Sequence, residues 1–208
     1  MNDQQRSRPW PDHLAWVIAP DDGPRRELAS ADEDVTCLYQ WKAGAFLATL
    51  PQVQTRCVGR AVADLGCGRG TLGLSACAHG ATRVLFADAS TVAIDFLTRT
   101  LARNQLDDRA RAVLHTWGDP LPDGPWEVIL GGDILYRPEC FAALLDTIAG
   151  SLTADGCALL SDPRITLENG LPSLAEARGL RWESARSDHF SLVTLTRGDS
   201  SRAGGCSN

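Results

Sequence analysis

Short apolar runs alternate with longer segments of helical period along most of the chain. A run of about five apolar residues predicts a buried strand, whereas apolar residues three and four positions apart predict an amphipathic helix. The strands expected on this basis are Ala61–Leu65, Arg83–Asp88, Ala110–His115, Trp126–Leu130, Gly156–Ser161, Arg181–Ala185 and His189–Thr196. The helices expected are Thr36–Leu50, ended by Pro51, then Thr71–His79, Thr91–Asn104, Pro138–Leu152 and Leu171–Arg178.

The order of these elements predicts an α/β domain with a mainly parallel, seven-stranded sheet. Strands that alternate with helices form parallel sheets, because each helix carries the chain back across the sheet. Only residues 186–188 separate the last two strands, which is too few for a parallel crossover, so the C-terminal strand should be antiparallel. We expect residues 36–197 to form this domain, residues 1–35 to be an irregular N-terminal extension and residues 198–208 to be a disordered tail.

A glycine-rich run, ADLGCGRG over residues 63–70, joins the first expected strand to the following helix. Its glycines allow the backbone to turn tightly and approach a ligand closely, and the helix offers its N-terminus. Cys67 within the run is expected as a small buried residue whose backbone N–H meets the ligand, rather than as a nucleophile. Asp88 ends the next expected strand, where a carboxylate can accept hydrogen bonds from both ribose hydroxyls. The run therefore predicts a site for a nucleoside cofactor.

The glycine spacing argues against a dinucleotide cofactor. In the dinucleotide-binding pattern a third glycine lies three residues beyond the second, and here that position is Thr71, with the additional glycine earlier at Gly70. An NAD-dependent oxidoreductase is therefore disfavoured.

Two further motifs follow later strands. Trp117, next to Gly118, comes after the third expected strand, where its indole could stack on an adenine ring or pack in the core. Asp133 and Tyr136 come after the fourth. If the chain enters a helical turn there, the two side chains share a face and could both reach an incoming nucleophile. The alternative is that Asp133 caps the next helix and Tyr136 packs beneath it.

Composition and charge exclude some classes of protein. The 208 residues are 44% hydrophobic and carry a formal net charge of −6, which argues against nonspecific binding to nucleic acid or to an anionic membrane. The longest apolar runs are of strand length and the N-terminus has no hydrophobic signal core, so we expect a cytoplasmic protein without a membrane span. The seven cysteines form no CxxC pair and the four histidines are isolated, which predicts free thiols and no metal site.

Taken together, ADLGCGRG, the Trp117-Gly118 pair and the DxxY sequence from Asp133 to Tyr136 resemble the class I, seven-β-strand protein lysine methyltransferases, which carry a (D/E)xx(Y/F) signature. The resemblance covers about residues 36–197. It implies a doubly wound, Rossmann-like fold, with S-adenosyl-L-methionine as cofactor and S-adenosyl-L-homocysteine as product. The positions that match the family's cofactor-lining residues are Trp41, Gly66, Gly68, Asp88, Trp117 and Gly132, and the acidic position that helps to place the methionine end of the cofactor is Asp64.

The resemblance also implies that the acceptor is a lysine nitrogen of a protein partner, with no nucleic acid or membrane involved. Asp133 would orient the incoming amine, and Tyr136 would shape the channel and hydrogen-bond. The stretch Asp162-Pro163-Arg164 is similar, in shortened form, to the DPxR stretch of the branch that acts on the electron-transfer-flavoprotein β subunit. A small-molecule N- or O-methyltransferase and a non-catalytic S-adenosylmethionine-binding module stay open as alternatives.

Overall fold

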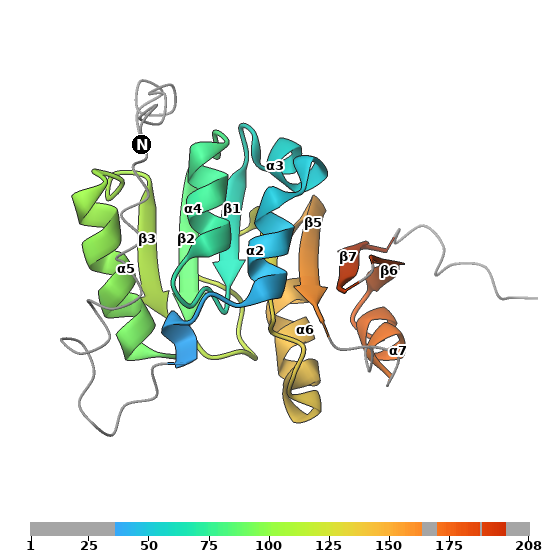
Figure 1. The fold of residues 1–208 in the computed structure, drawn as a ribbon. Helices are drawn as coiled ribbons and strands as arrows, with labels where there is room; N and C mark the ends of the chain where they lie inside the picture. The colour runs from blue at the N-terminus through green and yellow to red at the C-terminus, as the bar shows by residue number, and fades with distance from the viewer. Residues whose placement is uncertain (1–35, 164–169, 188, 199–208) are drawn as a thin grey trace, which may run out of the picture.

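One seven-stranded sheet runs through the part of the chain that the structure describes, which is residues 36–163, 170–187 and 189–198. In this computed structural model the strands are β1 Ala61–Leu65, β2 Arg83–Asp88, β3 Ala110–Leu114, β4 Trp126–Gly132, β5 Leu152–Asp162, β6 Leu180–Arg186 and β7 Ser191–Arg197. They lie in the order β3-β2-β1-β4-β5-β7-β6 (Figure 1). β7 is antiparallel to both of its neighbours and every other pair is parallel, which confirms the predicted sheet.

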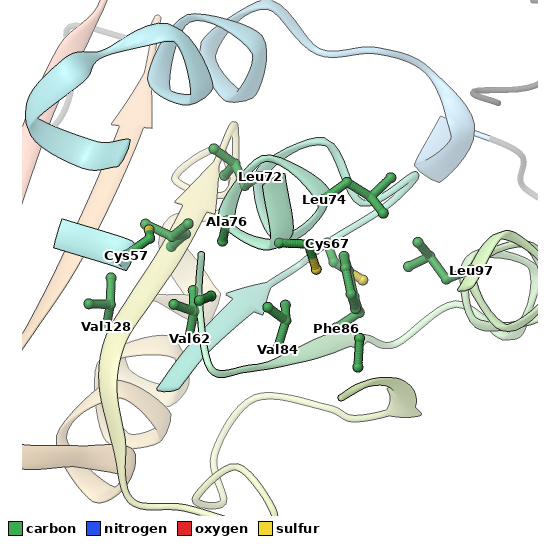
Figure 2. Close-up of a cluster of buried hydrophobic side chains, with 14 of the residues drawn as sticks. Cys57, Val62, Cys67, Leu72, Leu74, Ala76, Val84, Phe86, Leu97 and Val128 are labelled. Atoms are coloured by element: carbon green, nitrogen blue, oxygen red, sulfur yellow. The ribbon is translucent and has the colours of Figure 1, made fainter. Parts of the chain in front are cut away.

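Helices cover both faces of this sheet. They are η2 Thr36–Leu38, α2 Lys42–Thr49, α3 Pro51–Cys57, α4 Thr71–Ala78, α5 Thr91–Arg103, η3 Pro138–Cys140, α6 Phe141–Ser151 and α7 Leu171–Glu176. One face packs against α2 to α5 in an apolar cluster, part of which Figure 2 shows, that includes Leu47, Cys57, Leu72 and Leu97. The other face packs against α6 and α7 through residues such as Leu144 and Leu171. The doubly wound architecture is therefore confirmed.

The strand β1, which lies between β2 and β4 inside the sheet, is buried along its whole length. Helices on both faces of a parallel sheet leave its central strands no solvent-facing side, which explains why β1 reads as a continuous apolar run. Asp64 is the one ionisable residue in this strand, and its side chain is only 1% exposed. A carboxyl group at such a position needs a hydrogen-bond partner, since burying it unpaired is costly.

The segment before β1 differs from the predicted helix over residues 36–50. The chain instead forms η2, three non-helical residues and then α2. Pro51, which we expect from the sequence to end a helix, begins α3, a helix that the sequence analysis missed. The physical reason is that the fixed φ and missing N–H of proline suit the first residue of a helix as well as they interrupt its interior.

The strands β4 and β5 are longer than predicted. β4 continues to Gly132, and β5 begins at Leu152 rather than at Gly156. Glycine weakens a strand signal, so the pattern alone stops β4 early. In the sheet, however, Gly131 and Gly132 pair with β5. As a result Asp133 directly follows the last residue of β4, at the carboxyl edge of the sheet.

The predictions for the termini, the cysteines and a membrane span compare with the structure as follows. The predicted extension over residues 1–35 and the tail after residue 198 lie outside the described residues. The six cysteines within the described ranges are free thiols, as expected, and Cys206 lies outside them. No helix in those ranges is both long and apolar enough to cross a membrane.

Candidate functional site

The glycine-rich loop joins the end of β1 to the start of α4. Gly66 and Gly68 have φ values of +66° and +51°, a left-handed conformation that residues with a Cβ rarely adopt. The N–H groups of Gly66 and Cys67 both donate to the carbonyl of Ala87, at 2.8 and 3.1 Å. The loop is thus fastened to the end of β2, beside Asp88.

Asp88 faces the glycine-rich loop from the end of β2. Its carboxylate accepts hydrogen bonds from the Gly68 N–H at 2.8 Å and from the Ser90 N–H at 2.9 Å. Ser90 in turn caps α5 by accepting a hydrogen bond from the Ala93 N–H. A carboxylate offers about four lone-pair positions, so these two bonds orient the group without using its full capacity. Asp88 is therefore a suitable acceptor for ribose hydroxyls.

Asp64 accepts a hydrogen bond from the backbone of α4. Its Oδ2 atom lies 2.8 Å from the N–H of Gly73, the third residue of that helix, so the buried carboxyl caps the helix N-terminus. Burial raises the pKa of Asp64 to about 8; the Gly73 N–H opposes this rise and the negative charge of Asp88 adds to it. The sequence-based expectation of a contact with the methionine end of a cofactor stays a prediction.

Cys67 is buried in the cluster between the sheet and the helices α2 to α5 (Figure 2). Burial, together with the nearby negative charge of Asp64, raises the pKa of the Cys67 thiol well above its usual range. This environment agrees with an inert packing residue and argues against a nucleophile. The backbone N–H that we expect at the ligand donates instead to Ala87, because the loop turns back onto β2 at this residue.

Trp117 is half-buried between the core and the glycine-rich loop. It packs against the cluster that includes α6 and α7. A Cβ atom added to Gly66 would lie 3.7 Å from the indole atom Cζ2, so the ring lies beside the loop. The Gly118 N–H donates to the Thr147 hydroxyl of α6 at 2.8 Å, which holds the turn after Trp117 in place. Trp117 thus packs partly against the core and lies beside the glycine-rich loop, and the predicted stacking on an adenine ring stays a prediction.

The segment before α2 contacts the glycine-rich loop through Cys37, while Trp41 lies at the start of α2. The indole of Trp41 is 52% exposed, donates to the Thr36 carbonyl at 3.1 Å and meets the Tyr39 ring edge to face. The carbonyl oxygen of Cys37 lies only 2.5 Å from where a Cβ of Gly68 would be. Trp41 is thus no core residue. No sequence signal marked Cys37, because its contact with the loop depends on tertiary structure.

Asp133 follows β4 with a φ of +58°, a left-handed conformation that aspartate tolerates better than most residues. Its side chain is 9% exposed, and its Oδ2 atom accepts a hydrogen bond from the N–H of Gly44 at 3.0 Å. Gly44 is the third residue of α2. Asp133 therefore caps α2, a helix far away in the sequence, and not the helix that follows it.

The helical turn that would have placed Asp133 and Tyr136 on one face is absent. Residues 134–137 are not helical, and Tyr136 is 53% exposed rather than packed beneath a helix. The reason is the left-handed backbone of Asp133, after which the Leu135 N–H donates to the buried carboxylate of Asp162 at 3.0 Å. The predicted helical turn and the alternative in which Asp133 caps the following helix are therefore both wrong. That the two side chains reach an incoming nucleophile stays a prediction.

Four adjacent strands place a carboxylate at the same edge of the sheet. In the order β2, β1, β4 and β5, the residues at or next to the strand ends are Asp88, Asp64, Asp133 and Asp162. Each of these carboxylates accepts a hydrogen bond from one backbone N–H described above, and the donors are, in the same order, Gly68, Gly73, Gly44 and Leu135. Asp64, whose raised pKa of about 8 keeps it mainly protonated at neutral pH, adds little charge to this row. The members that are ionised favour cationic groups, because opposite charges attract strongly where solvent screening is reduced. Within the described residues no group of three or more histidine, cysteine or acidic side chains is arranged to hold a metal ion.

Comparison with known proteins identifies the family of this chain. A model of the family described as lysine methyltransferase matches residues 32–168. The chain is 38% identical to protein N-lysine methyltransferase METTL21A of Danio rerio over 126 residues, which are 58% of this chain and 56% of that protein. It is 32% identical to the electron transfer flavoprotein beta subunit lysine methyltransferase of Xenopus laevis over 159 residues, 73% of this chain and 61% of that protein. The chain thus spans somewhat more than half the length of these relatives.

The fold is shared with methyltransferases of known structure. The 16S rRNA methyltransferase RsmC of T. Thermophilus, solved in complex with AdoMet and guanosine, matches with a TM-score of 0.62 at 19% identity, over 76% of this chain and 44% of that one. At this identity the likeness concerns the fold. The family match, by contrast, includes the glycine-rich loop and the segment after β4. On these grounds the chain belongs to the lysine methyltransferase family.

Proposed function

We propose that this protein is an S-adenosylmethionine-dependent methyltransferase that modifies a lysine side chain of a protein substrate. The observation that carries the proposal is the buried Asp133 carboxylate, which lies at the end of β4, the neighbour of the strand that leads into the glycine-rich loop. Relatives with this family's sequence are named protein lysine methyltransferases, which supports the same acceptor.

The residues around the glycine-rich loop fit the cofactor. Asp88 would accept the ribose hydroxyls, and the half-buried indole of Trp117, beside Gly66, offers an apolar surface for the adenine. The Cys37 carbonyl lies against Gly68 of the loop, and the exposed Trp41, which family resemblance places at the cofactor, follows four residues later. When bound, S-adenosylmethionine supplies an activated methyl group on a cationic sulfonium, and the row of carboxylates at the sheet edge would favour that charge.

Asp133 is suited to hold the acceptor nitrogen. A lysine side chain with a solution pKa of about 10.4 arrives mainly as an ammonium ion, which must lose a proton before its nitrogen has a lone pair. The Asp133 carboxylate would attract the ammonium and align its nitrogen, and the exposed phenol of Tyr136 would flank its path. Alignment of this kind contributes several kcal/mol to barrier lowering, on the order of a 100-fold rate effect or more. Asp133 acts here as an orienting group rather than as a strong base.

The first test is calorimetric titration with S-adenosylhomocysteine, followed by incubation of the same sample with radiolabelled S-adenosylmethionine and a fractionated lysate. Binding together with label in a discrete protein band, located on lysine by mass spectrometry, is the expected result. Label on arginine would show that the acceptor is an arginine side chain and would overturn the proposed lysine acceptor. Label confined to small molecules would favour the small-molecule alternative, and binding without any transfer would favour the non-catalytic one. No binding would overturn the proposal.

A further inference from the structure

The backbone of α2 approaches the end of β4 unusually closely. A Cβ atom added to Gly132 would lie 2.8 Å from the Gly44 nitrogen and nearer still to its Cα, closer than real Cβ atoms come to other atoms. A Cβ atom added to Gly44 would cause no such clash, since it would lie 3.8 Å from the Gly132 Cα, an ordinary contact distance. The glycine at position 132 is therefore needed for the approach of the helix.

This approach brings the N-terminus of α2 to the Asp133 carboxylate. The Gly44 N–H, 3.0 Å from Asp133 Oδ2, belongs to the first turn of the helix, where N–H groups lack partners within the helix. The positive end of the helix dipole points the same way and favours a carboxylate. The bond joins residues 89 positions apart in the chain, so tertiary packing alone creates it.

A helix can position a carboxylate only if the helix itself has a fixed place, and several contacts fix α2. Leu47 is fully buried in the core cluster, and the carbonyl of Ala48 accepts a hydrogen bond from the Ser75 hydroxyl of α4. The Phe46 ring stacks on Phe190, with ring centroids 4.9 Å apart and planes 22° from parallel. The helix is thus anchored to α4, to the core and to the turn before β7, which leaves the Gly44 N–H in a defined place.

We propose that the N-terminus of α2 positions the Asp133 carboxylate for the transfer reaction, with the Gly44 N–H as the positioning group and Gly132 as the residue that permits the contact. The proposal rests on the function proposed above. It assigns Gly132 a role through Asp133, in addition to the cofactor contact that family resemblance implies. A carboxylate tilted away from Gly44 would hold the acceptor nitrogen off line, and a displacement of about 1 Å can lower a rate about 100-fold.

The variant Gly132→Ala tests this proposal, because its methyl group forces α2 away from Asp133. Its control is Gly150→Ala in α6, where the new Cβ would lie 2.8 Å from Pro120 Cγ, a milder steric clash away from Asp133. We expect Gly132→Ala to lower kcat about 10- to 100-fold while the Kd for S-adenosylhomocysteine changes less than about threefold. Gly150→Ala should lose stability without a change in kcat.

A double-mutant cycle separates positioning from general damage. If Gly132→Ala acts through Asp133, it should lower kcat less than about threefold in the Asp133→Ala background, because the group it displaces is already gone. Effects that multiply in the double variant would overturn the proposal, as would equal losses of kcat and cofactor affinity in Gly132→Ala.

Amide hydrogen exchange gives a readout that needs no activity. The Gly44 amide should exchange at least about tenfold faster in Asp133→Ala than in the unaltered protein, which corresponds to the loss of one hydrogen bond to a charged group. Equal exchange rates would show that the bond is not made in solution and would overturn the proposal, even if Gly132→Ala fails to fold. If the unaltered protein transfers no methyl group, the proposed function fails, and the Gly44 amide still decides whether α2 holds Asp133.

Discussion

At the scale of residues, the carboxylates at the sheet edge occupy similar positions at strand ends but differ in burial and in hydrogen-bond partners. Asp64 is fully buried and caps α4, whereas Asp88 is half-buried and accepts two N–H groups from the loops on either side of it. Asp133 lies between these cases, nearly buried but close in the chain to the exposed Tyr136. Under the proposed function, the same functional group would serve as a structural cap at Asp64, a ribose acceptor at Asp88 and an orienting group at Asp133.

The role of Asp88 can be tested by substitution with alanine. Asp88→Ala should weaken the binding of S-adenosylhomocysteine by about 2–3 kcal/mol, because charge-assisted hydrogen bonds to the ribose are lost. Calorimetry measures this change. Asp95→Ala, at an exposed position of α5, is the matched control and should bind normally. Normal binding by a folded Asp88→Ala variant would remove Asp88 from the cofactor site.

The pKa of Asp64 makes stability depend on pH. This carboxyl binds its proton more tightly in the folded chain, with a pKa of about 8, than at its ordinary value of 3.8. Its ionisation therefore destabilises the fold as pH rises between these two values. An asparagine side chain at this position cannot ionise, so Asp64→Asn should gain stability relative to the unaltered protein over this window, by at least about 1.4 kcal/mol. Urea unfolding at a series of pH values would show the gain, and parallel stability profiles would contradict it.

At the scale of elements, the segment from η2 to α2 links the two halves of the site. Cys37 lies against the glycine-rich loop, and its thiol is 3.3 Å from the hydroxyl of Ser90, which caps α5. A few residues later Gly44 reaches Asp133. The segment from η2 to α2, which no sequence motif marks as functional, thus connects the loop that we propose for the cofactor with Asp133, which we propose for the acceptor.

The start of α3 gives a prediction at this scale. Pro51 is the first residue of α3, where its fixed φ restricts the unfolded chain without straining the helix. Pro51→Ala should therefore lower the free energy of unfolding by about 0.4–1 kcal/mol. If Pro51 instead ended the preceding helix, as the sequence pattern predicts, alanine would let that helix continue and would stabilise the protein. The sign of the change in urea unfolding decides between these interpretations.

At the scale of the whole molecule, charge and fold act together. The chain has a formal net charge of −6, and the sheet topology gathers four aspartates from neighbouring strands at one edge. Three of these aspartates are buried, and Asp64 is mainly protonated at neutral pH, so the attraction would come from the ionised members of the group together with the net negative charge of the chain. A cationic acceptor peptide would be drawn toward this edge, because fields from several charges add. This attraction acts over a distance that salt shortens, to about 8 Å at physiological ionic strength.

The salt dependence of catalysis tests this attraction. The KM for a lysine-containing acceptor peptide should rise several-fold, on the order of 3- to 10-fold, between low and moderately high ionic strength, with a smaller change in kcat. The Kd of S-adenosylhomocysteine over the same salt series is the control, since this ligand carries little net charge. A KM that is insensitive to salt, or that falls, would contradict electrostatic attraction of the acceptor.

Local patterns were enough to predict the sheet and most helices. β1 and β2 match their predicted ranges residue for residue, because a buried parallel strand consists of consecutive apolar residues. The predictions that were wrong concern residues whose conformation depends on a distant contact. Pro51 begins a helix that packs on the sheet, and Gly131 extends a strand because β5 pairs with it.

The sequence by itself determined the alternation of strands and helices, the glycine-rich loop and the position of Asp88 at a strand end, since each depends on residues close together in the chain. Only the tertiary structure decided that Asp64 caps α4, that Cys37 lies on Gly68 and that Gly44 holds Asp133. These contacts join separate elements, and their distances follow from how the helices pack on the sheet. A pattern of neighbouring residues contains no information about such packing.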